Sequence, residues 1–286
     1  MSRDAHHTGA MRRIEHPGPP ARQRHRAVPC RVTPRRLVLR GGQTLHDAVV
    51  AALEESGARA AWLELADATL AALRYVIPAD DKSGEHAAWY SAIHALAPPA
   101  RLHRAGLHVG RRDGAPFLHC HGLWEGADGT RAMGHLLPTE SWLAEDAEAT
   151  CLVLEDALLE VTPDAETRFS LFAPHRTGEP APASNALLAT LRPNQDLGEA
   201  VEALAERYGL TEARLSGLGS LVGTAFADGS GLDSHATEVL ILDGRLAGGR
   251  ADIELAAVGI DGTHRRGRLA PGRNAVCVTA ELLLHP

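Results

Sequence analysis

The stretch LRGGQTLHDAVVAALEESG, residues 39–57, returns later in the chain as LRPNQDLGEAVEALAERYG, residues 191–209. Nine of the nineteen positions are identical at a constant offset of 152. Each stretch predicts a short strand followed by a helix. An N-cap residue precedes apolar residues at helical spacing, and a glycine follows them; these are Thr44 and Gly57 in the first stretch and Asp196 and Gly209 in the second. The repeat indicates that the chain is an internal duplication.

A second pair of similar stretches follows the helices. GADGTRAMGHLLP, residues 126–138, shares seven of thirteen positions with GIDGTHRRGRLAP, residues 259–271, at an offset of 133. The difference between 152 and 133 means that the first copy carries nineteen additional residues. We assign them to residues 78–100, which have proline near both ends and no counterpart in the second copy. The Asp-Gly in both stretches predicts a tight hairpin turn.

Apolar runs typical of strands fill the rest of each copy, including AAWLEL and TEVLIL before the hairpins and ATCLVLEDALLEV and NAVCVTAELLLHP after them. One helix with many strands in each copy predicts an α+β fold, in which a largely antiparallel sheet packs against one main helix. We expect a basic flexible arm at residues 1–36, a first domain at 37–173, a linker at 174–185 and a second domain at 186–286.

The composition is that of a globular protein, with 44% hydrophobic and 23% charged residues among 286. No apolar run approaches the roughly 18 residues of a membrane span, and the N-terminus lacks the apolar core of a secretory signal. We therefore expect a cytoplasmic protein without membrane contact. Cysteines are few and form no CxxC pair, so reduced thiols are expected at Cys30, Cys120, Cys151 and Cys277.

The charge is acidic overall and basic at one end. A net charge of -7 argues against a folded surface that coats nucleic acid. Residues 1–36, in contrast, hold nine arginines against two acids, Asp4 and Glu15. Such a segment suits contacts with phosphate groups, and it equally suits a solvated extension without a partner.

Three histidines gather around the hairpin of the first copy, in FLHCHGLWEGADGTRAMGHL, residues 117–136. His119 and His121 project from the same face of an extended strand, because alternate side chains share a face. Counting outward from the turn brings His135 close to the level of His121. Three neutral imidazoles on one face suit Zn(II), and also Ni, Co or Fe(II), whereas a chain with sixteen histidines also allows three unrelated surface side chains.

The second copy acts as a control within the same chain. It has Asp252, Glu254 and Arg268 where the first copy has the three histidines. An arginine can take the place of a lost cation by pairing with the two acids. We therefore interpret the second copy as a site that has lost its metal, and we expect metal in the first copy alone.

The order of these motifs resembles the plant and prokaryote conserved (PPC, or PCC) domain. The resemblance covers nearly all of residues 186–286, where the repeated helix is followed by ARLSGLGSL, and it covers the helix and hairpin of the first copy. It implies an α+β domain that usually assembles as a trimer, with a metal ion on His119, His121 and His135. It also implies DNA binding through an AT-hook in plant members, but no Arg-Gly-Arg-Pro core occurs in this chain.

A metal centre of this kind suits a reaction of a small carbonyl or carboxylate compound, which would need a general acid or base nearby. The additional segment supplies Glu85, His86 and Tyr90 as candidates for proton transfer. Arg74, just before it, is a candidate clamp for a substrate carboxylate. The same residues equally fit an ordinary surface loop.

Two other functions remain open from the sequence. HCHGLWE also fits the pattern H-x-H-x3-E, which predicts a cupin-like metalloenzyme with Glu125 as a further ligand, although its second motif is missing from the expected place. An oligomerising DNA-associated module, working through residues 1–36, is the other alternative. We place a metal-binding PPC-type protein first and DNA binding second.

Overall fold

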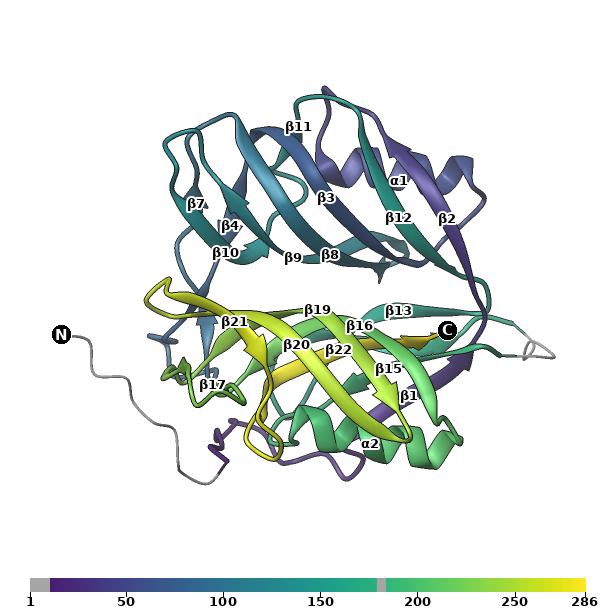
Figure 1. Cartoon of the computed structure of the whole chain (residues 1–286), viewed down its shortest axis with the longest axis vertical. Helices are drawn as coiled ribbons and strands as arrows, with labels where there is room; N and C mark the ends of the chain where they lie inside the picture. The colour runs from purple at the N-terminus through teal and green to yellow at the C-terminus, as the bar shows by residue number, and fades with distance from the viewer. Residues whose placement is uncertain (1–10, 179–183) are drawn as a thin grey trace.

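Two large sheets lie face to face, and one helix covers the outer side of each (Figure 1). The computed structural model describes residues 11–178 and 184–286. The first sheet has eleven strands. Its main path contains, in order, β2 (Val32–Leu39), β12 (Ala147–Leu154), β3 (Ala61–Ala72), β8 (Ala100–Arg112), β9 (Ala115–Glu125), β10 (Arg131–Leu136), β4 (Arg74–Val76) and β7 (His94–Ala95). Three more strands join beside this path: β11 (Trp142–Leu143), β13 (Ala157–Pro163) and β14 (Ser170–Arg176).

The second sheet has seven strands. They are, in order, β1 (His25–Cys30), β15 (Ala186–Leu191), β22 (Val276–His285), β16 (Glu212–Leu221), β19 (Thr237–Ala247), β20 (Arg250–Gly259) and β21 (His264–Arg268). Two short ribbons complete the described strands: β5 (Pro78–Ala79) with β6 (Trp89–Tyr90), and β17 (Thr224–Ala225) with β18 (Gly231–Leu232).

The strand order confirms the duplication. The run β2-β12-β3-β8-β9-β10 of the first sheet matches the run β15-β22-β16-β19-β20-β21 of the second, element for element. The alignment with an offset of 133 also holds within the sheets. Ala147 lies opposite Leu39, and Ala280 lies opposite Leu191 at the same point of the second copy.

Both predicted helices form where the repeat placed them. In α1 (Leu45–Glu55) the side chain of Thr44 accepts a hydrogen bond from the backbone N–H of Asp47. In α2 (Leu197–Tyr208) Asp196 does the same for the N–H of Glu199. Such caps satisfy N–H groups that the first helical turn leaves unpaired. Gly209 ends α2 in the left-handed conformation, with φ of 67°, which favours glycine.

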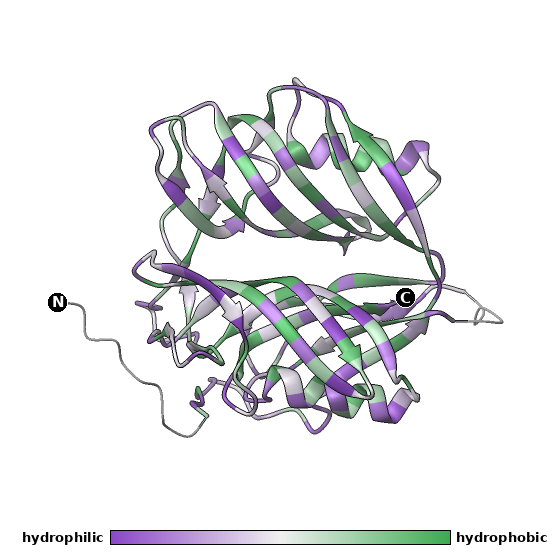
Figure 2. Cartoon of the chain, in the orientation of Figure 1, coloured by the Kyte–Doolittle hydropathy of each residue, from purple (hydrophilic) through white to green (hydrophobic). Residues whose placement is uncertain are grey.

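The predicted α+β class is wrong, because the protein is mostly β. Strands hold 55% of the chain and helices 8%. A helix of twelve residues is about 18 Å long, whereas seven strands span about 30 Å, so one helix cannot cover a sheet face alone. The helix covers part of the outer face, and the other sheet covers the inner face. Figure 2 shows apolar and polar bands alternating along the strands.

The largest hydrophobic core joins the two copies. Its buried residues include the helix side chains Leu45 and Val49 of the first copy and also Leu218, Leu240 and Leu283 from strands of the second sheet. The two halves are therefore one packed unit.

The long strand that we predicted at ATCLVLEDALLEV is wrong. The structure has two strands there, β12 and β13, and they lie at different places of the first sheet.

Close approach of the sheets depends on Gly106 of β8. A Cβ atom at this position would lie 2.5 Å from the ring of Trp62 and 2.7 Å from Cδ1 of Leu240 in β19. Real Cβ atoms do not approach other atoms this closely, and both neighbours are buried. Glycine at this point lets a strand of one sheet contact a strand of the other.

The expected flexible arm differs from the structure wherever it is described. Residues 1–10 lie outside the described residues, but β1 pairs with β15 of the second sheet and β2 pairs with β12 of the first. Apolar residues in this segment explain the difference: Cys30 and Val32 are buried in the main core. The arginines of β1 and β2 and the one between these strands stay exposed and do not prevent strand formation; they are Arg26, Arg31, Arg35 and Arg36.

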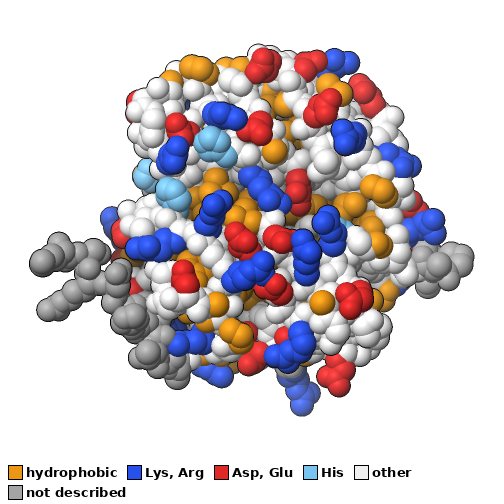
Figure 3. Space-filling view, viewed as in Figure 1, with side chains coloured by type: hydrophobic (Ala, Val, Ile, Leu, Met, Phe, Trp, Pro, Cys, Tyr) orange, Lys and Arg blue, Asp and Glu red, His pale blue; other side chains and the backbone are white. Residues whose placement is uncertain are grey.

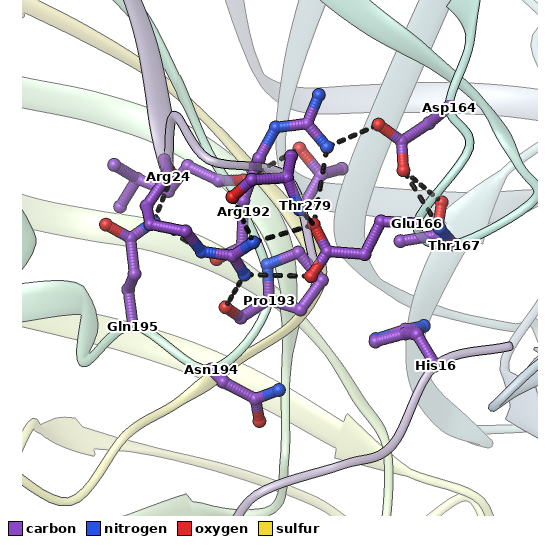
Figure 4. A network of polar contacts seen from close by, with 12 residues as sticks. His16, Arg24, Asp164, Glu166, Thr167, Arg192, Pro193, Asn194, Gln195 and Thr279 are labelled. Atoms are coloured by element: carbon purple, nitrogen blue, oxygen red, sulfur yellow. Dashed lines mark hydrogen bonds and ion pairs between the residues drawn. The ribbon is translucent and has the colours of Figure 1, made fainter. Parts of the chain in front are cut away.

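Residues just before β1 are held by a polar network near the sheet ends (Figure 4). The guanidinium of Arg24 donates two hydrogen bonds to the carboxylate of Glu166, at 2.8 and 2.9 Å. Arg192 pairs with the carboxylates of Asp164 and Glu166 from the other side. Asp164 also accepts a hydrogen bond from the backbone N–H of Thr167. This network connects the residues just before β1 to the loop before β14 and to the end of β15 in the second sheet.

The predicted linker at 174–185 begins inside a strand, since β14 continues to Arg176, and it ends at Asn185, whose side chain bonds the backbone of Val32. Residues 179–183 lie outside the described part. Neither of the helices in residues 11–178 and 184–286 has the length and apolar character that a membrane crossing requires.

Candidate metal centre

The three predicted histidines converge at one point of the inner face of the first sheet. β9 presents His119 and His121 on the same face, and His135 of β10 lies directly opposite His121, as the count from the turn predicted. Nε2 of His119 lies 3.1 Å from Nε2 of His121. One ring nitrogen of each histidine lies within 4.8 Å of the others.

A missing side chain makes room for this hairpin. A Cβ atom at Gly134 would lie 2.4 Å from the backbone oxygen of Val76 in β4. The glycine before His135 therefore allows β4 to pair closely with β10, and this pairing includes His135 itself, which lies opposite Val76.

Two acids from the second copy complete the cluster. Nδ1 of His119 donates a hydrogen bond to the carboxylate of Glu281 in β22, at 2.8 Å. A carboxylate oxygen of Glu238 in β19 lies 2.7 Å from Nε2 of His121. Nδ1 of His121 donates to the backbone oxygen of Val239, at 2.8 Å. The candidate centre therefore lies between the sheets and is built by both copies.

These hydrogen bonds decide which ring nitrogens are free. A histidine that donates from Nδ1 to a carboxylate or a carbonyl keeps its Nε2 lone pair for a metal ion. His119 and His121 both donate from Nδ1 and turn their Nε2 atoms toward each other, and a metal ion would displace the proton that Nε2 of His121 shares with Glu238. Nδ1 of His135 is buried and has no hydrogen-bond partner. The residues thus suit a divalent ion, which would draw the three nitrogens slightly closer together to reach the usual Zn–N distance of about 2.1 Å.

The charges of the cluster also favour a cation. Burial lowers the pKa of His119 to about 3, aided by the charge of His121. Burial holds the pKa of His135 well below its usual value, so both rings are neutral at pH 7. Burial raises the pKa of Glu281 to about 7, which means that its negative charge lacks full compensation. A divalent cation among the histidines would supply that compensation.

His121 and Glu238 behave as a pair. Burial alone would lower the pKa of His121, but the nearby carboxylate of Glu238 outweighs it and the pKa is raised. Burial alone would raise the pKa of Glu238, and the contact with His121 lowers it instead. A proton or a metal ion can therefore occupy the space between these two side chains.

A cavity of about 120 Å³ adjoins the cluster. His119, His135, Glu238 and Glu281 line it on one side. The other lining residues include five aromatic side chains and one arginine: Trp89, Tyr90, Phe117, Phe169, Phe172 and Arg112. Trp89 and Tyr90 come from the additional segment 78–100, which the second copy lacks.

Of the other predicted site residues, only Tyr90 lines the cavity. Tyr90 lines the cavity, and its ring centroid lies 5.5 Å from that of His135 in an edge-to-face arrangement. His86 does not line the cavity; its ring packs against that of Trp89 in a tilted arrangement, with the centroids 4.3 Å apart. Glu85 and Arg74 are exposed and do not line the cavity. The clamp that we predicted at Arg74 is thus not brought to the histidines.

Glu125, the ligand of the cupin-like alternative, also lies apart from the histidines. Its carboxylate pairs with Arg131 at 2.7 Å and with His103 at 3.5 Å. It lies four residues beyond His121 along an extended strand, a separation of about 13 Å. The structure therefore does not support the H-x-H-x3-E interpretation.

Sequence reasoning missed Glu238 and Glu281. Each acid stands within an otherwise apolar run, TEVLIL and VTAELLLH, and each is buried. A carboxylate at such a position is rare without a partner, and this signal was available in the sequence. At the degenerate position of the second copy, Arg268 pairs with Asp252 and lies opposite Glu254, as the alignment predicted.

Four of the eight arginines among residues 11–36 have acidic partners. Arg12 pairs with Asp233, Arg24 with Glu166, Arg31 with Glu155 and Arg36 with Glu148. Basic and acidic side chains are interspersed over the face that Figure 3 shows. Neither observation favours a phosphate-binding surface over the candidate metal centre.

The fold and the site together define a two-sheet β protein with a histidine centre enclosed between its duplicated halves. Solved structures similar to this chain each align with about half of it. A metal-containing protein from Archaeoglobus fulgidus is 25% identical over 50% of this chain and 96% of its own, with a TM-score of 0.42. A plant- and prokaryote-conserved protein from Pyrococcus horikoshii is 19% identical over 50% and 94%, with a TM-score of 0.41.

A protein from Ralstonia eutropha JMP134, provisionally described as DNA-binding, is 14% identical over 48% of this chain and 89% of its own, with a TM-score of 0.39. No protein-family model matches the chain, and no curated protein does. A PPC protein is thus among the structures to which the chain is similar, and each of these matches covers about half of the chain.

Proposed function

We propose that this chain binds a divalent metal ion, preferably zinc, through His119, His121 and His135. The observation that carries the proposal is the pair of hydrogen bonds from Nδ1 of His119 and Nδ1 of His121, which direct Nε2 of both rings at one point, where a metal ion would replace the proton that His121 shares with Glu238. A set of unrelated surface histidines would not be buried between two sheets with acids behind them.

We further propose that the centre serves a reaction of a small carbonyl or carboxylate compound in the adjoining cavity. A zinc ion supplies Lewis acidity, which polarises a carbonyl oxygen or acidifies a water molecule. Glu238 lines the cavity beside His121, so its carboxylate can accept and return a proton there. Glu281 orients His119, and aromatic side chains form much of the cavity wall. Tyr90 stays the second candidate for proton transfer.

Zinc titration of the metal-stripped full-length protein, with elemental analysis of the loaded sample, tests the metal centre. We expect about one ion per chain and a loss of affinity of more than about 100-fold in His135→Ala. Arg268→Ala changes the aligned position of the second copy and is the matched control, with unchanged zinc binding. Absence of zinc from the wild-type protein, or equal loss in both variants, would overturn the proposal.

The trimer-like assembly that the PPC resemblance implies stays a prediction. The mass of the protein in solution tests it directly, and it is independent of the zinc experiment.

A further inference from the structure

The cavity beside the histidines has three chemically different parts. Its far side has carboxylates, from Glu238 and Glu281, next to the imidazoles of His119 and His135. Its walls are aromatic. The ring of Phe169 stacks on Trp89 at 5.2 Å, and Phe117 meets Phe172 edge to face at 5.6 Å.

The third part is a single positively charged side chain, at the end of the cavity away from the carboxylates. Among the described residues that line the cavity, Arg112 is the only arginine or lysine. Its guanidinium carbon lies 4.5 Å from the centre of the Phe117 ring, which holds the side chain over the aromatic wall. The described ion pairs and hydrogen bonds give this guanidinium no carboxylate partner, unlike those of Arg101, Arg104 and Arg131.

Distances along β9 relate the cation to the histidines. Phe117 and His119 share one face of this strand, so their side chains are about 7 Å apart. A ligand that touches Arg112 at one end and the histidines at the other therefore spans little more than one ring with its substituents. The volume sets the same limit, since a cavity of about 150 Å³ accommodates benzene and this one has about 120 Å³, which leaves room for no more than one ring, with a substituent reaching the exposed Arg112.

The distribution of charge selects among small ligands. A carboxylate near Arg112 would gain a bidentate, charge-assisted contact. At the other end, the carboxylates of Glu238 and Glu281 balance the two charges of a divalent ion among the histidines, so a second negative group would gain no net attraction there. The cavity thus disfavours dianions such as phosphate esters, and it favours a ligand whose distal group is neutral and polar.

We propose that the cavity binds a single-ring aromatic monocarboxylate, with its carboxylate on Arg112, its ring between the Trp89–Phe169 pair and the Phe117–Phe172 pair, and a neutral polar substituent toward the histidines. This inference rests on the proposed function in one respect, that the distal substituent meets the metal centre. It also assigns a role to the additional segment 78–100, which supplies Trp89 and Tyr90 to the cavity wall.

Calorimetric titration with 4-hydroxybenzoate tests the inference, using zinc-loaded full-length protein whose metal content is measured in the same sample. Arg112→Met keeps an unbranched side chain and removes the charge. Because Arg112 is exposed, the variant should fold. Arg111→Met is the matched control, because Arg111 donates to the backbone oxygen of Gly114 and does not line this cavity. Quenching of tryptophan fluorescence, absent in Trp89→Phe, locates the ligand.

We expect 4-hydroxybenzoate to bind the wild-type protein, its methyl ester to bind at least about tenfold more weakly, and Arg112→Met to lose about tenfold while Arg111→Met stays within about twofold. Failure of the zinc-loaded protein to bind 4-hydroxybenzoate, or equal binding by Arg112→Met, overturns the inference and leaves the metal centre intact. Binding that depends on Arg112 in a protein that takes up no zinc would support the carboxylate site and overturn the proposed function.

Discussion

His119 and Glu281, 162 positions apart in the chain, are joined by a hydrogen bond of 2.8 Å from Nδ1 to the carboxylate. One residue belongs to the first copy and the other to the second. This contact makes the candidate centre a product of the whole chain, since neither copy alone contains both the histidines and the acids that orient them. Isolated copies are therefore unsuitable for testing it.

Glu281→Gln should weaken zinc binding about 10- to 100-fold, because an amide orients His119 less well and does not compensate the charge of the ion. Glu148 is the matched control. It occupies the aligned position in β12, is exposed, and lies 4.0 Å from Arg36. Glu148→Gln should bind zinc as the wild type does. Equal affinities of all three proteins, measured by competition with a chelator, would contradict this role of Glu281.

Arg24→Ala should lower the free energy of unfolding by about 2–3 kcal/mol, because it removes two hydrogen bonds from a nearly buried carboxylate. Arg36→Ala removes an arginine whose pair with Glu148 is fully at the surface, so little change is expected. Urea denaturation followed by circular dichroism measures both. A similar, small effect of the two substitutions would count against the network at Glu166.

Acid should destabilise the protein through this same network. Burial would raise the pKa of Glu166, but the hydrogen bond from Arg24 outweighs it, and the pKa is lower than the usual 4.5. The pKa of Asp164 is also lowered, since the hydrogen bond from the Thr167 N–H and the contact with Arg192 outweigh burial. The unfolded chain then binds protons first, so this stability is present above about pH 5 and is lost as the pH falls. Between pH 6 and 3.5, Glu166→Gln should lose less stability than the wild type; parallel losses would refute the assignment.

Gly106→Ala should destabilise the protein by about 1–3 kcal/mol, because the new methyl group would overlap the buried ring of Trp62 and the side chain of Leu240. Gly198→Ala, in the first turn of α2, is the control. A Cβ atom there would meet only a carboxylate oxygen of Asp196 at 3.4 Å, and alanine favours a helix. Thermal unfolding should thus shift downward for the first variant and not for the second. A shift of the same sign in both would argue against close packing of the sheets at Gly106.

Periodicity and repetition predicted much of the local structure. The two helices, their caps, the hairpin register of His121 and His135, and the pairing of Arg268 with Asp252 all depend on neighbours in sequence or on one strand pair. The fold class and the flexible arm were wrong for a shared reason. What covers a sheet face, and whether a basic segment joins a sheet edge, depends on surfaces that lie far away in the chain.

The sequence by itself determined the duplication, the helix that occurs once in each copy, and the hairpin that gathers three imidazoles, because helical periodicity, strand alternation and turn geometry act over a few residues. Only the tertiary structure decided that the inner faces of the two sheets pack together. That packing brings Glu238 and Glu281 against the histidines and closes the cavity that Arg112 lines. The packing of the two sheets is driven by burial of apolar surface, which is a non-directional interaction. A local sequence pattern therefore cannot predict which distant carboxylate will face which histidine.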